Sequence, residues 1–264
     1  MPTYSLTLEY DGTDFAGWQI QPSVRTAMGV FSDALSTVTT ESPALTAAGR
    51  TDSGTHAHGQ VVGCTLSRAW APDELRNALN ATLPADLAVR SVALQGDGFH
   101  ARRDAVERTY RYLVVCRDGR SPVMRRNAWI VRGPLDLDAM REAAASLVGA
   151  HDFVAFGSPP RIGGSTVRHI ASVSIERNLL GSGEAVLETV AITVCADAFL
   201  RGMMRSFTGA LVKIGQGRAT PAWLASLVDT ATVRDPSVSV APARGLHQWS
   251  VRYEPTATDQ ELAA

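Results

Sequence analysis

The feature that most restricts the fold of this chain is the order in which two kinds of hydrophobic periodicity follow one another. Residues 4–10 (YSLTLEY) alternate apolar and polar side chains at every step, which is typical of a half-buried strand. Thr26 is placed to cap a helix whose apolar positions recur at helical spacing. These positions are Met28, Phe31, Leu35 and Val38. A helix is also expected over 72–80, and strands over 43–48, 60–66 and 87–94. The predicted order is β-α-β-β-α-β.

The second part of the chain repeats this order with insertions. Residues 108–116 alternate as a strand. Asp136 is placed to cap a helix, and Gly149 is expected to end it. The inward side chains of that helix are Leu137, Met140, Ala144 and Leu147. The other expected elements are strands over 167–177, 185–196 and 249–253, a turn at 181–183, a helix over 200–214 before Gly215, and a short helix from Pro221.

A repeated β-α-β-β-α-β order predicts an α+β fold of two tandem ferredoxin-like halves. Each half would be an antiparallel sheet with its helices on one face. We therefore expect an N-terminal domain over 1–104, a C-terminal domain over 105–253 and a polar tail over 254–264. Because this fold hosts many activities, the function has to be inferred from particular residues.

The composition is that of an ordinary soluble chain, with 45% hydrophobic and 19% charged residues among 264. Apolar runs stay well below the roughly 18 residues that a membrane span needs. The first residues, MPTYSLTLEY, have no basic start followed by an apolar stretch, so a secretory signal is not expected. Cys64, Cys116 and Cys195 are widely spaced in apolar segments, and they predict buried free thiols in a reducing compartment. The sequence thus predicts a cytoplasmic protein without a membrane anchor.

Positive charge is concentrated in one part of a nearly neutral chain. The formal net charge is −1, yet residues 100–132 contain nine arginines against three acidic residues, a local charge of +6. A local basic zone of this kind suits a specific anionic partner such as a nucleic acid. A solvated surface is the plainer interpretation of the same charge run.

The stretch AGRTDSGTHAHGQVV, residues 48–62, is too polar for a core and too dense in reactive groups for an ordinary turn. Asp52, His56 and His58 have a spacing that permits a metal site, but no further ligand group is evident. A two-carboxylate hydrolase would need a second acid, which is absent nearby. A single carboxylate beside Arg50 could act as a nucleophile or a base. An aspartate that only caps its own turn explains the spacing equally well.

Several ordered motifs resemble those of the TruA-type tRNA pseudouridine synthases. GRTDSG followed by His56 and Ala57 is similar to the GRTDAGVHA motif of that family. The other segments that resemble the family, in its order, are YDGTDFAGWQIQ, LNATLPADLAV, FHARRDAVERTYRY, HDFVAF, FLRGMMR and GLHQWSVRY. The resemblance covers the chain to about Tyr253, and several motifs in order are far more specific than one alone.

The resemblance implies an enzyme that isomerises uridine to pseudouridine in the anticodon stem-loop of tRNA, at positions 38 to 40. The N1–C1′ bond breaks, the uracil turns while bound, and a C5–C1′ bond forms. This isomerisation needs neither a redox cofactor nor a metal, so we expect none. The resemblance also implies a homodimer, with tRNA as the partner.

Residue roles follow from the matched motifs. Asp52 matches the catalytic aspartate of the family, Tyr110 its active-site tyrosine and Arg205 the arginine paired with the catalytic carboxylate. Arg50 matches the arginine that helps to flip the target base. Contacts with the RNA backbone are expected from arginines of the basic zone, namely Arg102, Arg125 and Arg126. Attack by Asp52 at C1′, attack at C6 and a glycal route all remain open.

Several positions depart from the family pattern without removing a catalytic residue. Ser53 and Thr55 replace Ala and Val, Ala27–Met28 replaces Val-Gln, and His247–Gln248 replaces a Tyr-Leu pair. Gly202 stands where the family usually has histidine. The rival hypothesis is an RNA-binding protein that has kept the fold but not the chemistry. The joint presence of Asp52, Tyr110 and Arg205 favours the enzyme.

Overall fold

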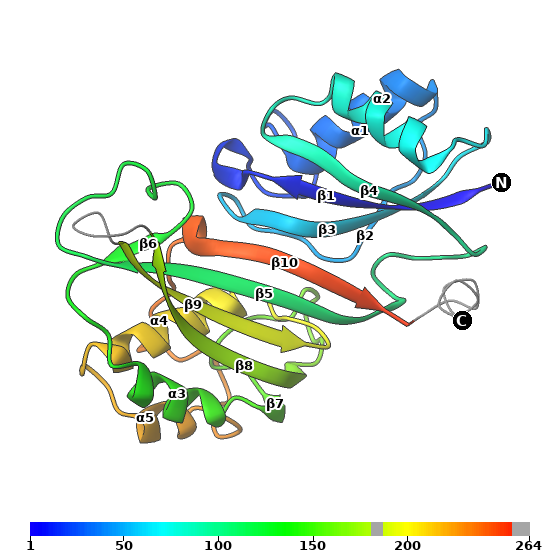
Figure 1. Ribbon diagram of the computed structural model, residues 1–264. Coiled ribbons are helices and arrows are strands. Elements are labelled where there is room, and N and C mark those ends of the chain that lie inside the picture. Colours follow the sequence, from blue (N-terminus) through cyan, green and yellow to red (C-terminus); the bar gives the residue numbers. More distant parts are fainter. Residues whose placement is uncertain (181–186, 255–264) are drawn as a thin grey trace, which may run out of the picture. The chain divides into compact units, whose positions relative to one another are not determined.

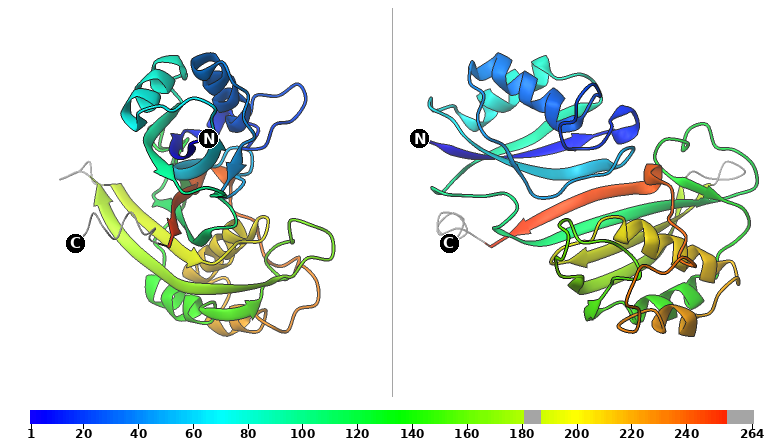
Figure 2. Two further views of the ribbon diagram at one scale, coloured as in Figure 1. Left: turned by 90° about the vertical axis from the view of Figure 1, so that its right-hand side faces the viewer. Right: turned by 180° about the vertical axis from the view of Figure 1, so that it is seen from behind.

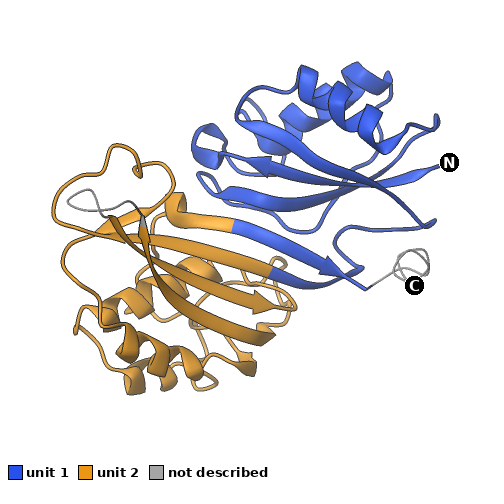
Figure 3. Cartoon of the chain, in the orientation of Figure 1, with its two compact units in different colours: residues 1–108, 248–264 blue, residues 109–247 orange. Residues whose placement is uncertain are grey.

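The computed structural model describes residues 1–180 and 187–254, and the chain forms two compact units (Figure 3). Unit 1 comprises Met1–Arg108 and the segment that begins at Gln248, and unit 2 comprises Thr109–His247. The protein is a mixed α/β protein dominated by mostly antiparallel strands. The expected division after residue 104 assigned the last strand to the second domain, whereas that strand from Gln248 onward groups with unit 1. In the hydrogen-bonded strand order it lies beside the strand His56–Thr65 of unit 1.

Unit 1 is a sheet with two helices packed on one face (Figure 1). Its elements are β1 (Thr3–Tyr10), η1 (Gly12–Asp14), α1 (Ala27–Thr39), β2 (Thr46–Ala47), β3 (His56–Thr65), α2 (Pro72–Thr82) and β4 (Leu87–Gln95). The last strand, β10 (Leu246–Tyr253), continues the hydrogen-bonded order as β4-β1-β3-β10. β1 is antiparallel to both β3 and β4.

The helices of unit 1 begin and pack as their sequences predict. The Thr26 hydroxyl accepts a hydrogen bond from the Gly29 N–H at 3.3 Å, which caps α1. Pro72 stands at the start of α2, where its missing N–H has no helical partner to lose. The apolar side chains of both helices reach the sheet, and Phe31, Leu35, Leu75 and Leu79 are fully buried. Burial of one such side chain contributes about 1.5–3 kcal/mol.

The strands around the polar stretch differ from the expectation. β3 begins at His56 rather than at residue 60, because β1 pairs with it as far as Tyr10↔Ala57. Both histidines of the stretch therefore lie in a strand. β2 contains only Thr46–Ala47 of the strand expected over 43–48. The polar connection between β2 and β3 is thus the segment 48–55.

Unit 2 has the same kind of construction, a sheet with α3, α4 and α5 gathered on one face (Figure 2). Its elements are β5 (Ala105–Cys116), β6 (Trp129–Val131), α3 (Leu137–Ala145), β7 (Gly149–Asp152), β8 (Val167–Leu180), β9 (Leu187–Ala196), α4 (Met203–Gly215), α5 (Pro221–Ala225) and η3 (Ala243–Gly245). The strand order is β5-β9-β8-β7, and β6 runs parallel to β5.

The Asp136 carboxylate caps α3 as expected by accepting hydrogen bonds from the N–H groups of Asp138 and Ala139. The expectation that Gly149 ends this helix is wrong, because α3 ends at Ala145 and Gly149 begins β7 with a φ of 113°. The expected turn at 181–183 and the tail after Glu254 lie outside the described residues. Among residues 1–180 and 187–254, no helix has the length and apolar character to cross a membrane.

Candidate active site

Segment 48–55, here called the Asp52 loop, leaves the sheet between β2 and β3 of unit 1. The Ala48 N–H still donates to the Val61 carbonyl at 2.9 Å, so the loop starts where the ladder of β2 and β3 ends. The Thr55 N–H donates to the Asp52 carbonyl at 3.1 Å and closes a turn before β3. Asp52 is half-buried and Arg50 is exposed. The loop therefore presents a carboxylate and a guanidinium two residues apart.

The segment that follows β1 holds the Asp52 loop from one side. The Tyr10 hydroxyl lies 2.8 Å from the Thr51 hydroxyl, and the Trp18 N–H donates to the Thr51 carbonyl at 3.0 Å. The Phe15 carbonyl accepts from the Gly54 N–H at 3.3 Å. The side chains of Tyr10, Phe15 and Trp18 are at most 3% exposed, so these anchors belong to the core of unit 1. The residues on both sides of Asp52 are thus tied to buried structure.

Gly12 lets η1 approach the end of the loop. A Cβ atom at this position would lie 1.9 Å from the Thr55 carbonyl oxygen, closer than any side chain can be accommodated. The Gly12 N–H also donates to Nδ1 of His56 at 3.1 Å. The family-like segment YDGT therefore has a structural role, because it packs the turn after β1 directly against the loop.

The metal hypothesis for Asp52, His56 and His58 gains no support from this geometry. His56 is 3% exposed, and its Nδ1 lies 3.1 Å from both the Gly12 nitrogen and the Asp11 carboxylate. The His58 ring packs against Trp249 with ring centroids 4.6 Å apart. In the described part of the chain, no three His, Cys, Asp or Glu side chains are grouped so that they could hold a metal ion.

In unit 2, Tyr110 and Tyr112 lie on the same face of β5 but differ in burial. Tyr110 is half-buried, and its ring meets Phe199 edge-on with centroids 4.7 Å apart. Tyr112 is fully buried, and its hydroxyl donates to the Pro242 carbonyl at 2.6 Å. Burial raises the pKa of Tyr112 well above its usual value, while the positive charges of Arg244 and Arg205 oppose that rise. Tyr112 is therefore a neutral hydrogen-bond donor, and Tyr110 is the more accessible of the two rings.

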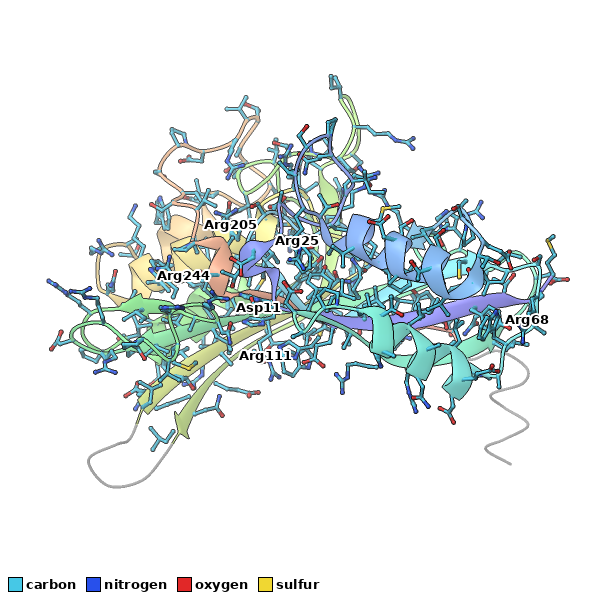
Figure 4. All side chains as sticks on the ribbon, turned by 90° about the horizontal axis from the view of Figure 1, so that it is seen from above. Asp11, Arg25, Arg68, Arg111, Arg205 and Arg244 are labelled. Carbon is cyan, nitrogen blue, oxygen red and sulfur yellow. The ribbon has the colours of Figure 1, made fainter. Side chains whose placement is uncertain are left out.

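Arg205 stands in the first turn of α4 and is half-buried. Its Nε donates to the Ala241 carbonyl at 2.7 Å, and the Ala241 N–H donates back to the Arg205 carbonyl at 3.0 Å. This reciprocal pair fixes the arginine stem against the segment before η3. Arg244, on η3, contributes a second positive charge near the Tyr112 hydroxyl. Figure 4 labels Arg205 and Arg244, which both belong to unit 2.

The departure at Gly202 has a structural counterpart. Gly202 is the N-cap of α4 with a φ of 76°, a left-handed conformation that glycine adopts without strain. A Cβ atom there would lie 3.8 Å from the guanidinium of Arg234. Arg234 in turn donates to the Ser206 hydroxyl at 3.1 Å. A guanidinium therefore lies beside the position that carries a histidine in the family pattern.

The sequence-predicted site residues are divided between the units. Unit 1 contains Arg50, Asp52 and Arg102, and unit 2 contains Tyr110, Arg125, Arg126 and Arg205. Arg102, Arg125 and Arg126 are all exposed, and the last two lie in the connection between β5 and β6. The basic zone thus contributes exposed arginines to both units.

Sequence reasoning missed the residues that hold the Asp52 loop in place. Tyr10, Thr51 and Gln60 are buried polar residues within or beside apolar strands. The one indication in the sequence was Gln60 within the apolar run GQVVGC. A polar side chain in such a strand is buried in the structure and needs a hydrogen-bond partner. The identity of that partner was not visible from local spacing.

The protein resembles tRNA pseudouridine synthases in sequence along almost its whole length. The profile of the family described as tRNA pseudouridine synthase matches residues 7–104 and 143–254. Asp52 and Arg205 lie in the matched ranges, and Tyr110 falls between them. The tRNA pseudouridine synthase A of Geobacter sp. (strain M21) is 37% identical over 253 residues, which cover 96% of this chain and 99% of that protein.

Two further relatives extend this similarity to other bacteria. The tRNA pseudouridine synthase A of Syntrophotalea carbinolica is 39% identical over 255 residues, covering 97% of this chain and 98% of that protein. The enzyme of the same name from Allorhizobium ampelinum is 40% identical over 256 residues, covering 96% and 95%. A mixed α/β fold with a tethered aspartate loop and this extent of identity define an RNA-modifying isomerase. The chain belongs to the tRNA pseudouridine synthase family.

Proposed function

We propose that the chain isomerises uridine to pseudouridine at positions 38 to 40 of the tRNA anticodon stem-loop, with Asp52 as the reacting anion. The observation that carries this proposal is the construction of the Asp52 loop. A half-buried carboxylate stands between residues whose backbone and side chains are hydrogen-bonded to three buried residues, Tyr10, Phe15 and Trp18. Such preorganisation is what a reacting group needs, because misplacement by about 1 Å can cost a hundredfold in rate.

The chemistry requires one bond to break and another to form within the same nucleotide. The N1–C1′ bond breaks, the uracil stays bound and turns, and C5 joins C1′. The C5 proton is lost to solvent and N1 takes up a proton from solvent, so the product is an isomer of the substrate. A carboxylate can serve this sequence by adding to C1′, by adding to C6 or by removing the C2′ proton. All three routes use the residues present and balance without an oxidant, a reductant or a metal.

The remaining roles in this proposal come from the family resemblance. Arg205 keeps the Asp52 carboxylate ionised, Tyr110 stacks on the uracil, and Arg50 assists in flipping the base out of its stack. The half-buried ring of Tyr110 and the exposed side chain of Arg50 suit these tasks. Arg102, Arg125 and Arg126 are exposed and suit contacts with RNA phosphates.

We also propose that each half of the chain is a ferredoxin-like domain. The order β1-α1-β2-β3-α2-β4 in unit 1, with β4-β1-β3 as neighbouring strands, supports this assignment. In the second half of the sequence the corresponding elements are β5, α3, β8, β9, α4 and β10, with β6, β7 and α5 as insertions. A homodimer and a cytoplasmic location belong to the same proposal and follow from the resemblance and the tRNA substrate.

The Asp52→Asn variant tests the central assignment. Asparagine keeps the size and the turn-forming capacity of aspartate but cannot act as an anion. We expect a folded protein that binds tRNA with near-normal affinity and forms no pseudouridine, since loss of essential chemistry commonly costs several orders of magnitude. The measurement is a single-turnover assay with unmodified tRNA and pseudouridine mapping. Near wild-type turnover would show that Asp52 is only a turn residue, as the rival RNA-binding hypothesis requires.

A further inference from the structure

Two buried glutamines form a chain of amide hydrogen bonds that ends on the Asp52 loop. The Gln248 side-chain Nε2 donates to Oε1 of Gln60 at 3.0 Å, and Nε2 of Gln60 donates to the Gly49 carbonyl at 2.9 Å. The Gly49 N–H donates back to Oε1 of Gln60 at 3.4 Å. Both glutamine side chains are 0% exposed. A strand at the far end of the sequence is therefore linked to a residue of the loop.

The hydrogen-bond chemistry fixes the direction of this chain. The Gly49 carbonyl can only accept, so the NH₂ group of Gln60 has to face it. Oε1 of Gln60 then faces the Gly49 N–H and Gln248, and Gln248 has to act as the donor. Within residues 1–180 and 187–254, Oε1 of Gln248 has no hydrogen-bond partner. A buried oxygen without a hydrogen bond lowers the stability of the fold. The orientation of the Gln248 amide that leaves its oxygen in this state therefore calls for an explanation.

The position of Gln60 beside the end of the β2–β3 ladder supplies that explanation. The ladder between β2 and β3 contains Thr46↔Gly63 and Ala47↔Val62, and the Ala48 N–H reaches the Val61 carbonyl. The backbone at Gly49 leaves the ladder, and the Gln60 side chain supplies the next pair of hydrogen bonds in its place. Arg50 follows immediately and Asp52 lies three residues beyond Gly49. The entry of the loop is thus held by one side-chain amide.

We propose that Gln60 is a positioning residue for the Asp52 loop and that Gln248 fixes the orientation of its amide. This inference rests on the proposed function, because it concerns the placement of the carboxylate that is assigned the chemistry there. Gln60 is fully buried and acts through Gly49, so its loss should slow the chemical step more than it weakens tRNA binding. Gln248 stands where the family pattern has leucine, so this chain adds a second contact to the entry of the loop.

The Gln60→Met variant, with Asn80→Leu as its matched control, tests the first part of the proposal. The Asn80 amide makes the same two-point clasp on a backbone, with bonds of 2.8 Å to the carbonyl and the N–H of Val89, but it does so at β4. Both variants should melt at lower temperature. Only Gln60→Met should lose single-turnover rate at saturating tRNA, by about ten- to a hundredfold, with little change in the dissociation constant for tRNA. A folded Gln60→Met protein with the rate of the control overturns the proposal.

Two substitutions at Gln248 test its role through the pH dependence of the rate. This dependence should not change if Gln248 has only a structural role. In Gln248→Glu the introduced carboxyl donates to Oε1 of Gln60 only while it is protonated, so the rate relative to wild type should fall as the pH rises. Gln248→Leu loses the same bond at every pH, and its relative rate should be reduced severalfold and stay constant with pH. If the two variants give the same pH-independent ratio, Gln248 does not orient Gln60. If Gln60→Met does not fold, the comparison of Gln248→Glu with Gln248→Leu tests the proposal by itself.

Asp52→Asn, assayed in parallel, separates this inference from the function on which it rests. An inactive Asp52→Asn variant together with a fully active Gln60→Met variant rejects only the positioning role. An active Asp52→Asn variant rejects the assignment of Asp52 itself, whatever the glutamine variants show. An inactive Asp52→Asn variant with slowed Gln60→Met and a pH-dependent Gln248→Glu supports both.

Discussion

The Asp52 loop of unit 1 and the Arg205 region of unit 2 hold their polar groups by different means. Asp52 lies outside regular structure, and long-range bonds from Tyr10, Trp18 and Gln60 hold the residues around it. Arg205 stands in a 13-residue helix, and one reciprocal contact with Ala241 fixes its stem. The backbone around the carboxylate is therefore held by buried contacts distant in sequence, whereas the backbone that carries the arginine belongs to a regular helix.

This difference separates the effects that substitutions in the two regions should have. A change in the anchors of the Asp52 loop should displace a reacting group, and so alter the rate at saturating tRNA. A change at a side chain of a regular helix or an exposed connection should remove a charge and leave the backbone in place. Variants in each region therefore test whether the comparison extends to function.

After Asp52→Asn, the largest effect is expected for Arg205→Ala, which removes the charge but keeps α4. If Arg205 keeps the Asp52 carboxylate ionised, the single-turnover rate should fall by about a hundred- to a thousandfold. A carboxylate without a cationic partner takes up a proton more readily, so raising the pH should restore part of the activity. The measurement is the single-turnover rate against pH at saturating tRNA for the wild type and the variant.

The opposite assignment of Arg205 gives a different pattern in the same assay. If the arginine only contacts RNA backbone, higher tRNA concentration should restore much of the rate and higher pH should restore nothing. Arg205→Lys serves as a control for lost packing, because it keeps a charge and most of the stem. That control should be less impaired than the alanine variant under the first assignment.

Charge reversal at Arg125 and Arg126 should affect binding rather than chemistry. Both side chains are exposed in the connection between β5 and β6. Loss of each phosphate contact should lower the slope of log affinity against log salt by about 1. The matched control is Arg68→Glu with Arg76→Glu, two arginines of unit 1 outside the basic zone. Equal losses of tRNA affinity in both double variants would contradict the assignment of residues 100–132 as the footprint.

Tyr10→Phe should have a smaller effect, confined to the rate. The substitution removes the hydroxyl that lies 2.8 Å from the Thr51 hydroxyl, one residue before Asp52. We expect the rate at saturating tRNA to fall by roughly three- to tenfold, below the hundredfold of a full 1 Å displacement. Tyr4→Phe is the control, since Tyr4 is a buried tyrosine of the same strand whose hydroxyl bonds to the backbone of Trp70. It should lose stability and keep its rate.

The contrast between the regions also explains which parts of the structure could be predicted from the sequence. Helix starts at Thr26, Pro72 and Asp136 were predictable because the capping residue and the helix it caps are adjacent in sequence. β6 and β7 were missed because strands of three and four residues are too short to show alternation. Their existence depends on partners elsewhere in the chain.

The motif that contains Asp52 is local in sequence, whereas the contacts that hold its loop are not. The motif around Asp52 could be identified from the sequence, because the residues that carry the family resemblance are consecutive. The bonds from Tyr10 and Gln248 join residues 41 and 188 positions apart in sequence, so no local pattern reveals them. The bond between Gln60 and Gln248 joins two segments of unit 1 that are far apart in sequence.

The smallest expected effect concerns a side-chain clasp in unit 2 that should matter for stability alone. Nδ1 of His151, in β7, lies 2.6 Å from the Asp229 carboxylate, and that carboxylate also accepts from the Asp152 N–H at 2.7 Å. The hydrogen bond with Asp229 raises the pKa of His151. The backbone hydrogen bond from Asp152 and the bond with His151 lower the pKa of Asp229. The charged pair is therefore favoured in the folded state.

The direction of each shift sets the pH range of this contribution. The His151 part is complete below the ordinary histidine pKa and is lost as the pH rises through the raised value in the folded protein. The Asp229 part is complete above the ordinary aspartate pKa and is lost as the pH falls through the lowered value. Both parts are present together between about pH 4 and pH 6.5, so Asp229→Asn should lower the melting temperature most in that range.

Thermal melts of Asp229→Asn against pH measure this contribution. The pair is partly exposed, so we expect a decrease of about 1–2 °C that shrinks as the pH rises above the histidine range. Asp138→Asn is the control, because Asp138 pairs with an arginine, Arg141, and not with a histidine. A pH-independent decrease in both variants would show that the charge of His151 does not contribute. A change in the rate at saturating tRNA for Asp229→Asn would instead contradict the assignment of this clasp to stability alone. The clasp would then support the chemistry as the anchors of the Asp52 loop do.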